Sequence, residues 1–84
     1  MANDYIQLAE SMKALGHPIR LQIVSGLITN GCCNVKQIQE SLGVPQSTIS
    51  QHLKILKNAG VIEGKRDGTM VCYNVIVDWV KNVI

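Results

Sequence analysis

Apolar residues recur at helical spacing in two adjacent segments near the middle of the chain. They are Val35, Ile38 and Leu42 in the first segment, then Ile49, Leu53 and Leu56 in the second. Such spacing places apolar side chains on one face of a helix. Between the segments, Gly43 can adopt the left-handed conformation that ends a helix, and Pro45 suits the first turn of the next helix. The pattern therefore predicts two short helices joined by a tight turn, a helix-turn-helix.

A further helix is predicted at the start of the chain, over residues 3–15. Its large side chains share one helical face, and they are Tyr5, Leu8, Met12 and Leu15. Asn3 or Asp4 can cap its first turn, and Gly16 ends it.

A second helix and the start of the third are indicated by capping residues. Pro18 opens the second helix in the first-turn position, with His17 near the cap. Its buried side is formed by Leu21, Val24, Leu27 and Ile28. After a turn at residues 29–31, Asn34 can cap the third helix, with Gln37 as its capping-box partner.

After Gly60 the pattern changes to that of two β-strands, over residues 61–75. In the second strand Val71, Tyr73 and Val75 alternate with Met70, Cys72 and Asn74. The pair Asp67-Gly68 is typical of a hairpin tip. A hairpin directly after a helix-turn-helix is a wing, a ribbon placed beside the second helix of that unit.

The chain closes with an apolar segment, residues 76–84. One face carries Ile76, Val80, Val83 and Ile84, with Trp79 beside them. An exposed patch of this kind usually marks an interface, so we assign it, with the first helix, to a twofold contact between two copies of the chain. The expected interface residues are Tyr5, Leu8, Met12, Trp79, Val80 and Val83. Packing of the segment on its own core is the alternative.

The predicted helix over residues 45–59 carries short polar side chains outside its apolar stripe. They are Gln46, Ser47, Thr48, Ser50, Gln51 and Lys54. Groups of this kind reach base edges and phosphates in a major groove. Lys65 and Arg66 in the wing are the expected phosphate contacts. The hypothesis is a helix that reads double-stranded DNA.

The distribution of charge supports this hypothesis more than its size does. The formal net charge is only +2, which alone is weak evidence for a nucleic-acid partner. Positive and negative charges are equal in number within residues 1–42, and again within residues 68–84. The whole excess lies between Gly43 and Asp67, where basic residues outnumber Glu63 and Asp67; they are Lys54, Lys57, Lys65 and Arg66.

The bulk composition indicates one small domain, 1–84, in a chain of 84 residues that are 46% apolar but include no Phe. No run of about 18 apolar residues exists, and the N-terminus lacks the regions of a signal peptide. We therefore expect a cytoplasmic protein without a membrane partner. Its three cysteines are expected to be reduced thiols.

Taken together, these features resemble the ArsR/SmtB family of bacterial winged-helix repressors. The resemblance covers nearly the whole chain and is carried by ALGHPIRLQIV at 14–24, LGVPQSTISQHL at 42–53, LKNAGVI at 56–62, and KRDG at 65–68 followed by Tyr73. It implies a mainly α fold, a winged helix-turn-helix of four helices, two strands and a final helix. It also implies a homodimer that binds an imperfect inverted repeat in a promoter and represses transcription, usually until an inducer releases it.

The resemblance assigns roles to the polar residues already singled out. The major-groove positions are Gln46, Ser47, Ser50 and Gln51, and the wing positions are Lys65 and Arg66. Pro45 departs from the pattern, because family members often have a Ser there that caps the reading helix. His52 follows the pattern, and we expect it to pack beside the core or to contact a phosphate rather than to bind metal.

Many members of this family sense metals, but neither of their two recurrent sites is present. One is a Cys-x-Cys-x-x-Cys pattern at the third helix, whose thiolates hold soft ions. The matching positions here are Asn34, Lys36 and Gln39. The other is a set of Asp and His across the last helix, and no His follows His52 although Asp78 is present. No cofactor is therefore predicted.

Cys32, Cys33 and Cys72 form an alternative regulatory site. By architectural analogy, the extended piece before the third helix pairs with the second wing strand, which would bring these thiols together. They could then bind a soft metal ion or oxidise, and regulate the same repressor fold. A plain structural role is favoured, because buried free cysteine is a common small hydrophobe.

Two other classes of function are weaker alternatives. An enzyme is not expected, because the chain has no Cys-x-x-Cys, no acid-base pair and no phosphate loop. A winged helix used for protein contacts is disfavoured by the polar start of the reading helix and by the localised charge. The last helix is short for the family, so whether the native chain continues beyond Ile84 is left open.

Overall fold

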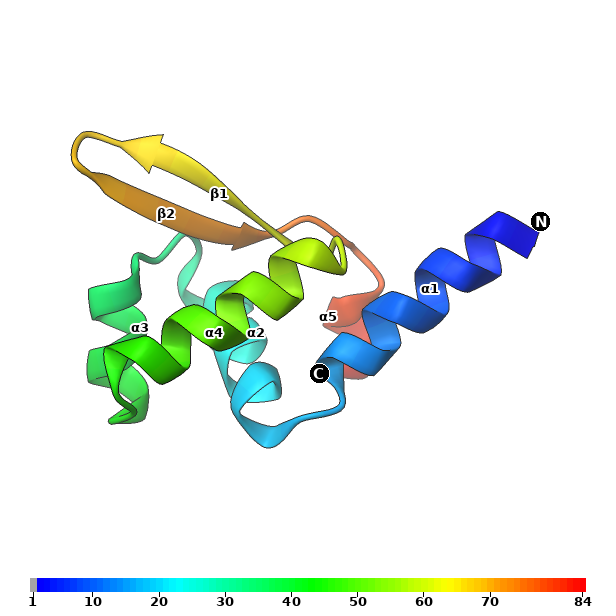
Figure 1. Cartoon of the computed structure of the whole chain (residues 1–84), viewed down its shortest axis with the longest axis horizontal. Coiled ribbons are helices and arrows are strands. Elements are labelled where there is room, and N and C mark those ends of the chain that lie inside the picture. Colours follow the sequence, from blue (N-terminus) through cyan, green and yellow to red (C-terminus); the bar gives the residue numbers. More distant parts are fainter. Residues whose placement is uncertain (1) are drawn as a thin grey trace.

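The computed structural model describes residues 2–84, with side chains from Asp4 onward (Figure 1). Its elements follow the order α1 (Ala2–Leu15), α2 (Pro18–Asn30), α3 (Val35–Leu42), α4 (Gln46–Asn58), β1 (Ile62–Asp67), β2 (Met70–Val75) and α5 (Val80–Val83). The helices pack around one core, and the antiparallel hairpin of β1 and β2 extends along one side. The predicted mainly α winged helix-turn-helix fold is confirmed.

The predicted caps define where α2 and α3 begin and end. The His17 side chain accepts a hydrogen bond of 3.1 Å from the backbone N–H of Ile19. Asn34 Oδ1 accepts from the N–H of Gln37 at 2.8 Å, while Gln37 Oε1 accepts from the N–H of Asn34 at 2.9 Å. This reciprocal pair is the expected capping box. Gly43 ends α3 in the left-handed conformation, with φ of 67°.

The start of α4 differs from the prediction by one residue. Pro45 is the N-cap with extended backbone angles, φ −55° and ψ 146°, and the helix begins at Gln46. No side chain caps this end. The backbone N–H groups of the first turn of α4 are therefore left without a side-chain acceptor.

The core is built mostly from the apolar stripes that the spacing predicted. In α2 the prediction was wrong for Leu21, which is 38% exposed, and Ile23 is buried instead. Apolar side chains that are at most 5% exposed come from every helix, from the start of β1 and from the residue before it: Ala14, Leu15, Ile23, Val24, Leu27, Ile38, Ile49, Leu53, Leu56, Val61, Ile62 and Val80. Burying a side chain of this size contributes about 1.5–3 kcal/mol. Among residues 2–84, no helix is both long enough and apolar enough to cross a membrane.

Helix α1 is joined to the end of α4 by two polar side chains. Gln7 Nε2 and Ser11 Oγ both donate to the backbone carbonyl of Ala59, each at 3.0 Å. Ser11 is itself buried. The two expected caps, Asn3 and Asp4, both lie within α1, and the side chain of Asn3 is outside the described residues.

The hairpin pairs β1 with β2 from Ile62 opposite Val75 to Asp67 opposite Met70. Its loop therefore consists of Gly68 and Thr69, one residue later than the predicted tip. Gly68 has a φ of 64°, and no residue other than glycine has a positive φ among those described. Glycine at the first position of a two-residue loop matches a type II′ turn, whose twist suits a hairpin.

A short extended piece before α3 pairs with β2, as the architectural analogy predicted. The N–H of Cys33 donates to the carbonyl of Tyr73 at 3.1 Å, and the N–H of Tyr73 donates to the carbonyl of Cys33 at 2.8 Å. Beside this bridge, Asn34 Nδ2 contacts Met70 Sδ at 3.6 Å. The hairpin is thus anchored to the start of α3.

The C-terminal segment departs most from the prediction. Residues 76–79 are not helical, because the N–H of Ile76 donates to the carbonyl of Val61 at 3.0 Å and continues the path of the hairpin. Only Val80–Val83 form a helix. Val80 is completely buried in the core of its own chain, so its assignment to an intermolecular surface is wrong. Val83, at 62% exposed, remains on the surface.

The capping box makes a prediction for stability. Replacing Asn34 by Ala should lower the free energy of unfolding by about 1 kcal/mol, because the N–H of Gln37 loses its acceptor at the start of α3. Urea unfolding followed by circular dichroism measures this loss. Asn30→Ala, at an exposed position in the last turn of α2, is the control. Equal effects of the two substitutions would contradict the role of the cap.

Candidate nucleic-acid interface

The solvent-facing side of α4 carries the side chains predicted to read DNA. Gln46, Ser47, Ser50, Gln51 and Lys54 are exposed, and Thr48 is half-buried. On the opposite side Ile49, Leu53 and Leu56 are at most 2% exposed, which fixes the rotation of the helix. With 13 residues, α4 is about 20 Å long, and a helix of this width fits a DNA major groove.

The wing brings the two predicted cations to the surface, but not on one face. Lys65 and Arg66 are both exposed and follow each other in β1. Successive side chains of a strand point to opposite faces, so one cation lies on each side of the ribbon. Lys65 Nζ lies 3.6 Å from Glu63 Oε1, and both side chains are solvated, so this ion pair contributes little.

The wing and the reading helix point toward the same end of the molecule. In Figure 1 the hairpin tip and the start of α4 both lie toward the end that is opposite α1. The contact between Asn34 and Met70 places the first residue of β2 beside the start of α3. The polar start of α4 and the basic hairpin can therefore face one partner together.

A contact between α2 and α4 involves His17, Arg20 and His52. The two imidazole rings lie 4.6 Å apart, and Arg20 Nη1 lies 3.4 Å from His52 Nδ1. Arg20 Nε also donates to the carbonyl of Ala14. Because a guanidinium can only donate, this contact suits a His52 ring whose Nδ1 carries no proton. The expectation that His52 packs beside the core is supported by this contact.

The same surroundings lower the pKa of His52 below its ordinary value of 6.5. Burial is the largest cause, followed by the electrostatic influence of His17 and of the Arg20 guanidinium. The role of Arg20 was missed by sequence reasoning, because the contact joins helices 32 residues apart and leaves no periodic signal.

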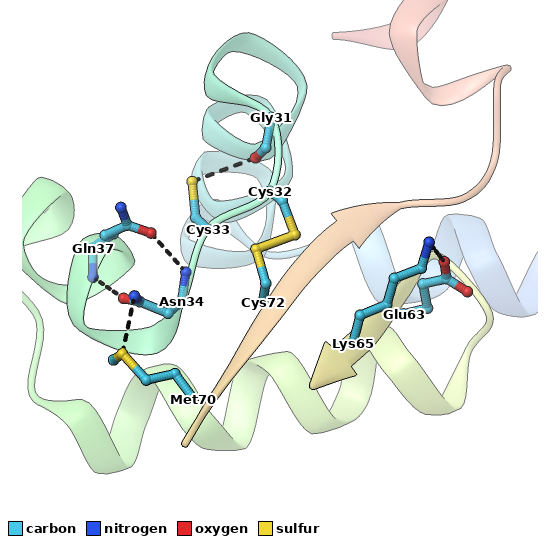
Figure 2. The surroundings of a disulfide bond; sticks show 9 residues. All are labelled: Gly31, Cys32, Cys33, Asn34, Gln37, Glu63, Lys65, Met70 and Cys72. Atoms are coloured by element: carbon cyan, nitrogen blue, oxygen red, sulfur yellow. Dashed lines mark hydrogen bonds and ion pairs between the residues drawn. A yellow bond between two sulfur atoms is a disulfide. The ribbon is translucent and has the colours of Figure 1, made fainter. Parts of the chain in front are cut away.

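Two of the three cysteines form a disulfide. Cys32 and Cys72 are joined, with their Cα atoms 5.6 Å apart (Figure 2). The expectation of three reduced thiols is therefore wrong for this pair, because the antiparallel bridge between Cys33 and Tyr73 brings the segment before α3 alongside β2. Cys33 is free and donates from Sγ to the carbonyl of Gly31 at 3.4 Å.

The structure gives no support to a metal centre. Within the described part of the chain, no group of three or more His, Cys, Asp or Glu side chains is placed to hold a metal ion. The soft-ion site considered for the cysteines would need three converging thiolates, and the sulfurs of Cys32 and Cys72 are bonded to each other.

Comparison with known proteins identifies the family. The sequence model described as "Bacterial regulatory protein, arsR family" matches residues 17–63. The chain belongs to the ArsR family. It is 44% identical to an HTH-type transcriptional regulator of Methanocaldococcus jannaschii, over 95% of this chain and 90% of that protein. The match includes α2, the helix-turn-helix and the start of the wing.

Solved structures of relatives share the complete fold. The transcriptional repressor PagR of Bacillus anthracis superimposes with a TM-score of 0.92 at 34% identity, over 99% of this chain and 94% of that one. A homodimeric winged helix-turn-helix DNA-binding domain from Mycobacterium bovis gives 0.84 at 33% identity, over 98% and 75%. The protein is thus a DNA-binding transcriptional regulator of this family and not an enzyme.

The lowered pKa of His52 predicts a loss of stability on acidification. Below pH 6.5 the unfolded chain takes up a proton on this residue, whereas the folded protein takes it up only at a lower pH. Between these two pKa values, the free energy of unfolding falls as the pH falls. His52→Gln should reduce this slope, as measured by urea unfolding between about pH 7.5 and about pH 5.5. An unchanged slope would argue against a perturbed His52.

Proposed function

We propose that this chain is a homodimeric repressor that binds an inverted-repeat operator, with α4 in the major groove and the wing on the DNA backbone. The observation that carries the proposal is the exposed polar face of α4, held in one orientation by a buried apolar stripe. Beside it lies the whole positive excess of the chain. Most of the binding affinity would come from contacts with the phosphates, and the sequence preference would come from α4.

Base readout is assigned to the amide side chains of α4. Gln46 and Gln51 are exposed, and a glutamine amide can bond to two atoms of an adenine edge in the major groove. Ser47, Thr48 and Ser50 add hydroxyl groups, and Lys54 adds a cation on the same helix. The uncapped N–H groups at the start of α4 suit a phosphate, because they lie at the positive end of the helix dipole.

Phosphate contacts are assigned to Lys65 and Arg66. Both are exposed in the half of the hairpin nearer its tip, and the hairpin is anchored to the segment before α3 through Tyr73 in the middle of β2. Because they lie on opposite faces of the ribbon, the wing would touch one backbone with one cation and leave the other beside the adjacent groove.

The dimer contact is assigned to α1 and the C-terminal segment. Tyr5 and Met12 are 68% and 51% exposed, and Leu8 and Trp79 are half-buried. The last residues of α1 and the first residue of α5 share the core, since Ala14, Leu15 and Val80 belong to one buried cluster. Large apolar groups left exposed on a small domain mark an interface. The homodimeric relative from Mycobacterium bovis supports this assignment.

We place the protein in the cytoplasm, because its partner would be promoter DNA of the chromosome. Regulation by a soft metal ion is not part of the proposal, because no group of three or more His, Cys, Asp or Glu side chains among the described residues is placed to hold a metal ion.

The division between base and backbone contacts can be tested with substitutions. Gln51→Ala should weaken binding to the selected operator by about 1–3 kcal/mol and relax base preference at one position. Lys65→Ala should instead weaken binding to all sequences alike and lower the salt slope by about one. Fluorescence anisotropy on duplexes selected from random DNA, at several salt concentrations, measures both effects.

The matched controls for these variants are Gln22→Ala on α2 and Lys13→Ala on α1, two exposed positions away from the proposed interface. Identical behaviour of the Gln51 and Lys65 variants would refute the division of roles. Because Lys13 lies on α1, the helix assigned to self-association, each control is also checked by sedimentation velocity. Loss of binding in a control that is still a dimer would place the DNA elsewhere on the surface.

A second test concerns the dimer. Met12→Glu should weaken self-association about 100-fold, because a twofold interface buries the new carboxylate twice at a cost of about 1–3 kcal/mol each. Met70→Glu places the same change on the wing, where the methionine is 43% exposed, and should leave the dimer intact. Sedimentation velocity distinguishes the two. A dimer that resists Met12→Glu would exclude this face of α1.

A further inference from the structure

The disulfide lies where both ends of the DNA-binding unit meet. Cys32 precedes α3 and Cys72 lies in β2, 40 residues later in the chain. The segment between them contains α3, α4 and β1, which are the helix-turn-helix and the first wing strand. Figure 2 shows the bond joining the loop after α2 to the middle of β2. One covalent bond therefore closes a ring around the proposed DNA-contacting elements.

The backbone holds the two cysteines together independently of the sulfur atoms. Cys33 and Tyr73 exchange two hydrogen bonds of 3.1 and 2.8 Å, directly after Cys32 and Cys72 in the two strands. The Cα separation of 5.6 Å lies within the range that a disulfide requires. If the bond is reduced, the thiols remain neighbours, so the bond can form again without refolding.

The pair is accessible to small reagents. Cys32 is exposed and Cys72 is half-buried. Proteins that work on chromosomal DNA lie in a compartment that keeps thiols reduced, where a disulfide is usually transient and redox-sensing. An exposed disulfide is also among the more readily reduced ones.

We propose that Cys32 and Cys72 form a reversible oxidation site for hydroperoxides, and that the disulfide raises DNA affinity by fixing the wing against the start of α3. This inference rests on the proposed DNA-binding function. The thiolate of Cys32 attacks the peroxide, takes one oxygen as a sulfenic acid and releases water or an alcohol. The Cys72 thiol then displaces that oxygen as water and forms the S–S bond. A small dithiol reverses the step and is itself oxidised to a disulfide.

The expected direction follows from what holds β2 in place. Without the S–S bond, β2 is held to the α3 side by the two backbone hydrogen bonds between Cys33 and Tyr73 and, next to the hairpin loop, by the contact of Asn34 with Met70. With it, the relative position of β2 and α3 is fixed covalently. A surface that is already ordered loses less entropy on binding, so the oxidised protein should bind DNA more tightly.

Cys33 provides an internal control for the chemistry. Its Sγ lies next to the carbonyl of Gly31 and is not part of the disulfide. Hydrogen peroxide should therefore join Cys32 to Cys72 in the whole chain and in Cys33→Ser, with loss of two hydrogen atoms by mass spectrometry. Dithiothreitol should restore both thiols. Cys32→Ser and Cys72→Ser should form no intramolecular bond. A disulfide that includes Cys33, or none at all, would overturn the proposal.

A second experiment measures the DNA affinity of the same proteins in both redox states. Oxidised wild type and oxidised Cys33→Ser should bind the selected duplex about fivefold to tenfold more tightly than their reduced forms. Cys32→Ser and Cys72→Ser should match reduced wild type under both conditions, with folding checked by circular dichroism. Equal affinities of the two redox states, or tighter binding by the reduced state, would overturn the proposal.

Failure of the proposed DNA-binding function can be distinguished from failure of the redox proposal. If no redox state bound any duplex, the assignment of α4 and the wing to DNA would fall. Hydrogen exchange at the β2 amides would then decide the remaining claim, since the disulfide should slow exchange there in the oxidised protein. Identical exchange in the two states would refute a fixed wing.

Discussion

Ile49, Leu53 and Leu56 remove one side of α4 almost completely from solvent. The helix cannot rotate about its axis without exposing side chains that each contribute about 1.5–3 kcal/mol. Residues from the other elements surround this stripe, including Leu15 of α1 and Val80 of α5. The direction of the glutamines on the opposite side is therefore a consequence of core packing, and it needs no partner to establish it.

Local signals explain why so much of the fold could be predicted from the sequence. The apolar spacing of residues within one helix identifies its buried side, and Asn34 and Gly43 mark boundaries through their own backbone chemistry. The polar face of α4 follows directly from these local rules. The positions that departed from the predictions depend on other segments. Spacing placed Val80 on an apolar face, but it could not say whether that face meets its own core or another molecule.

The disulfide and the contacts of His52 also depend on segments that are distant in the sequence, so local spacing could not predict them. The pairing of Cys32 with Cys72 requires β2 to meet the piece before α3, and architectural analogy predicted the approach but not the bond. The contact of His52 with Arg20 depends on how α2 crosses α4. Pro45 illustrates a finer ambiguity, because proline suits both the residue before a helix and its first turn.

The shared acceptor at Ala59 affects more than the packing of α1. Gln7 and Ser11 tie the helix that we assign to self-association to the last turn of the helix that we assign to DNA. In a twofold assembly through α1, these bonds would connect the self-association helix of each copy directly to its own α4. The distance between the recognition helices, and with it the number of base pairs that separate two half-sites, would then depend on these two hydrogen bonds as well as on the shared core.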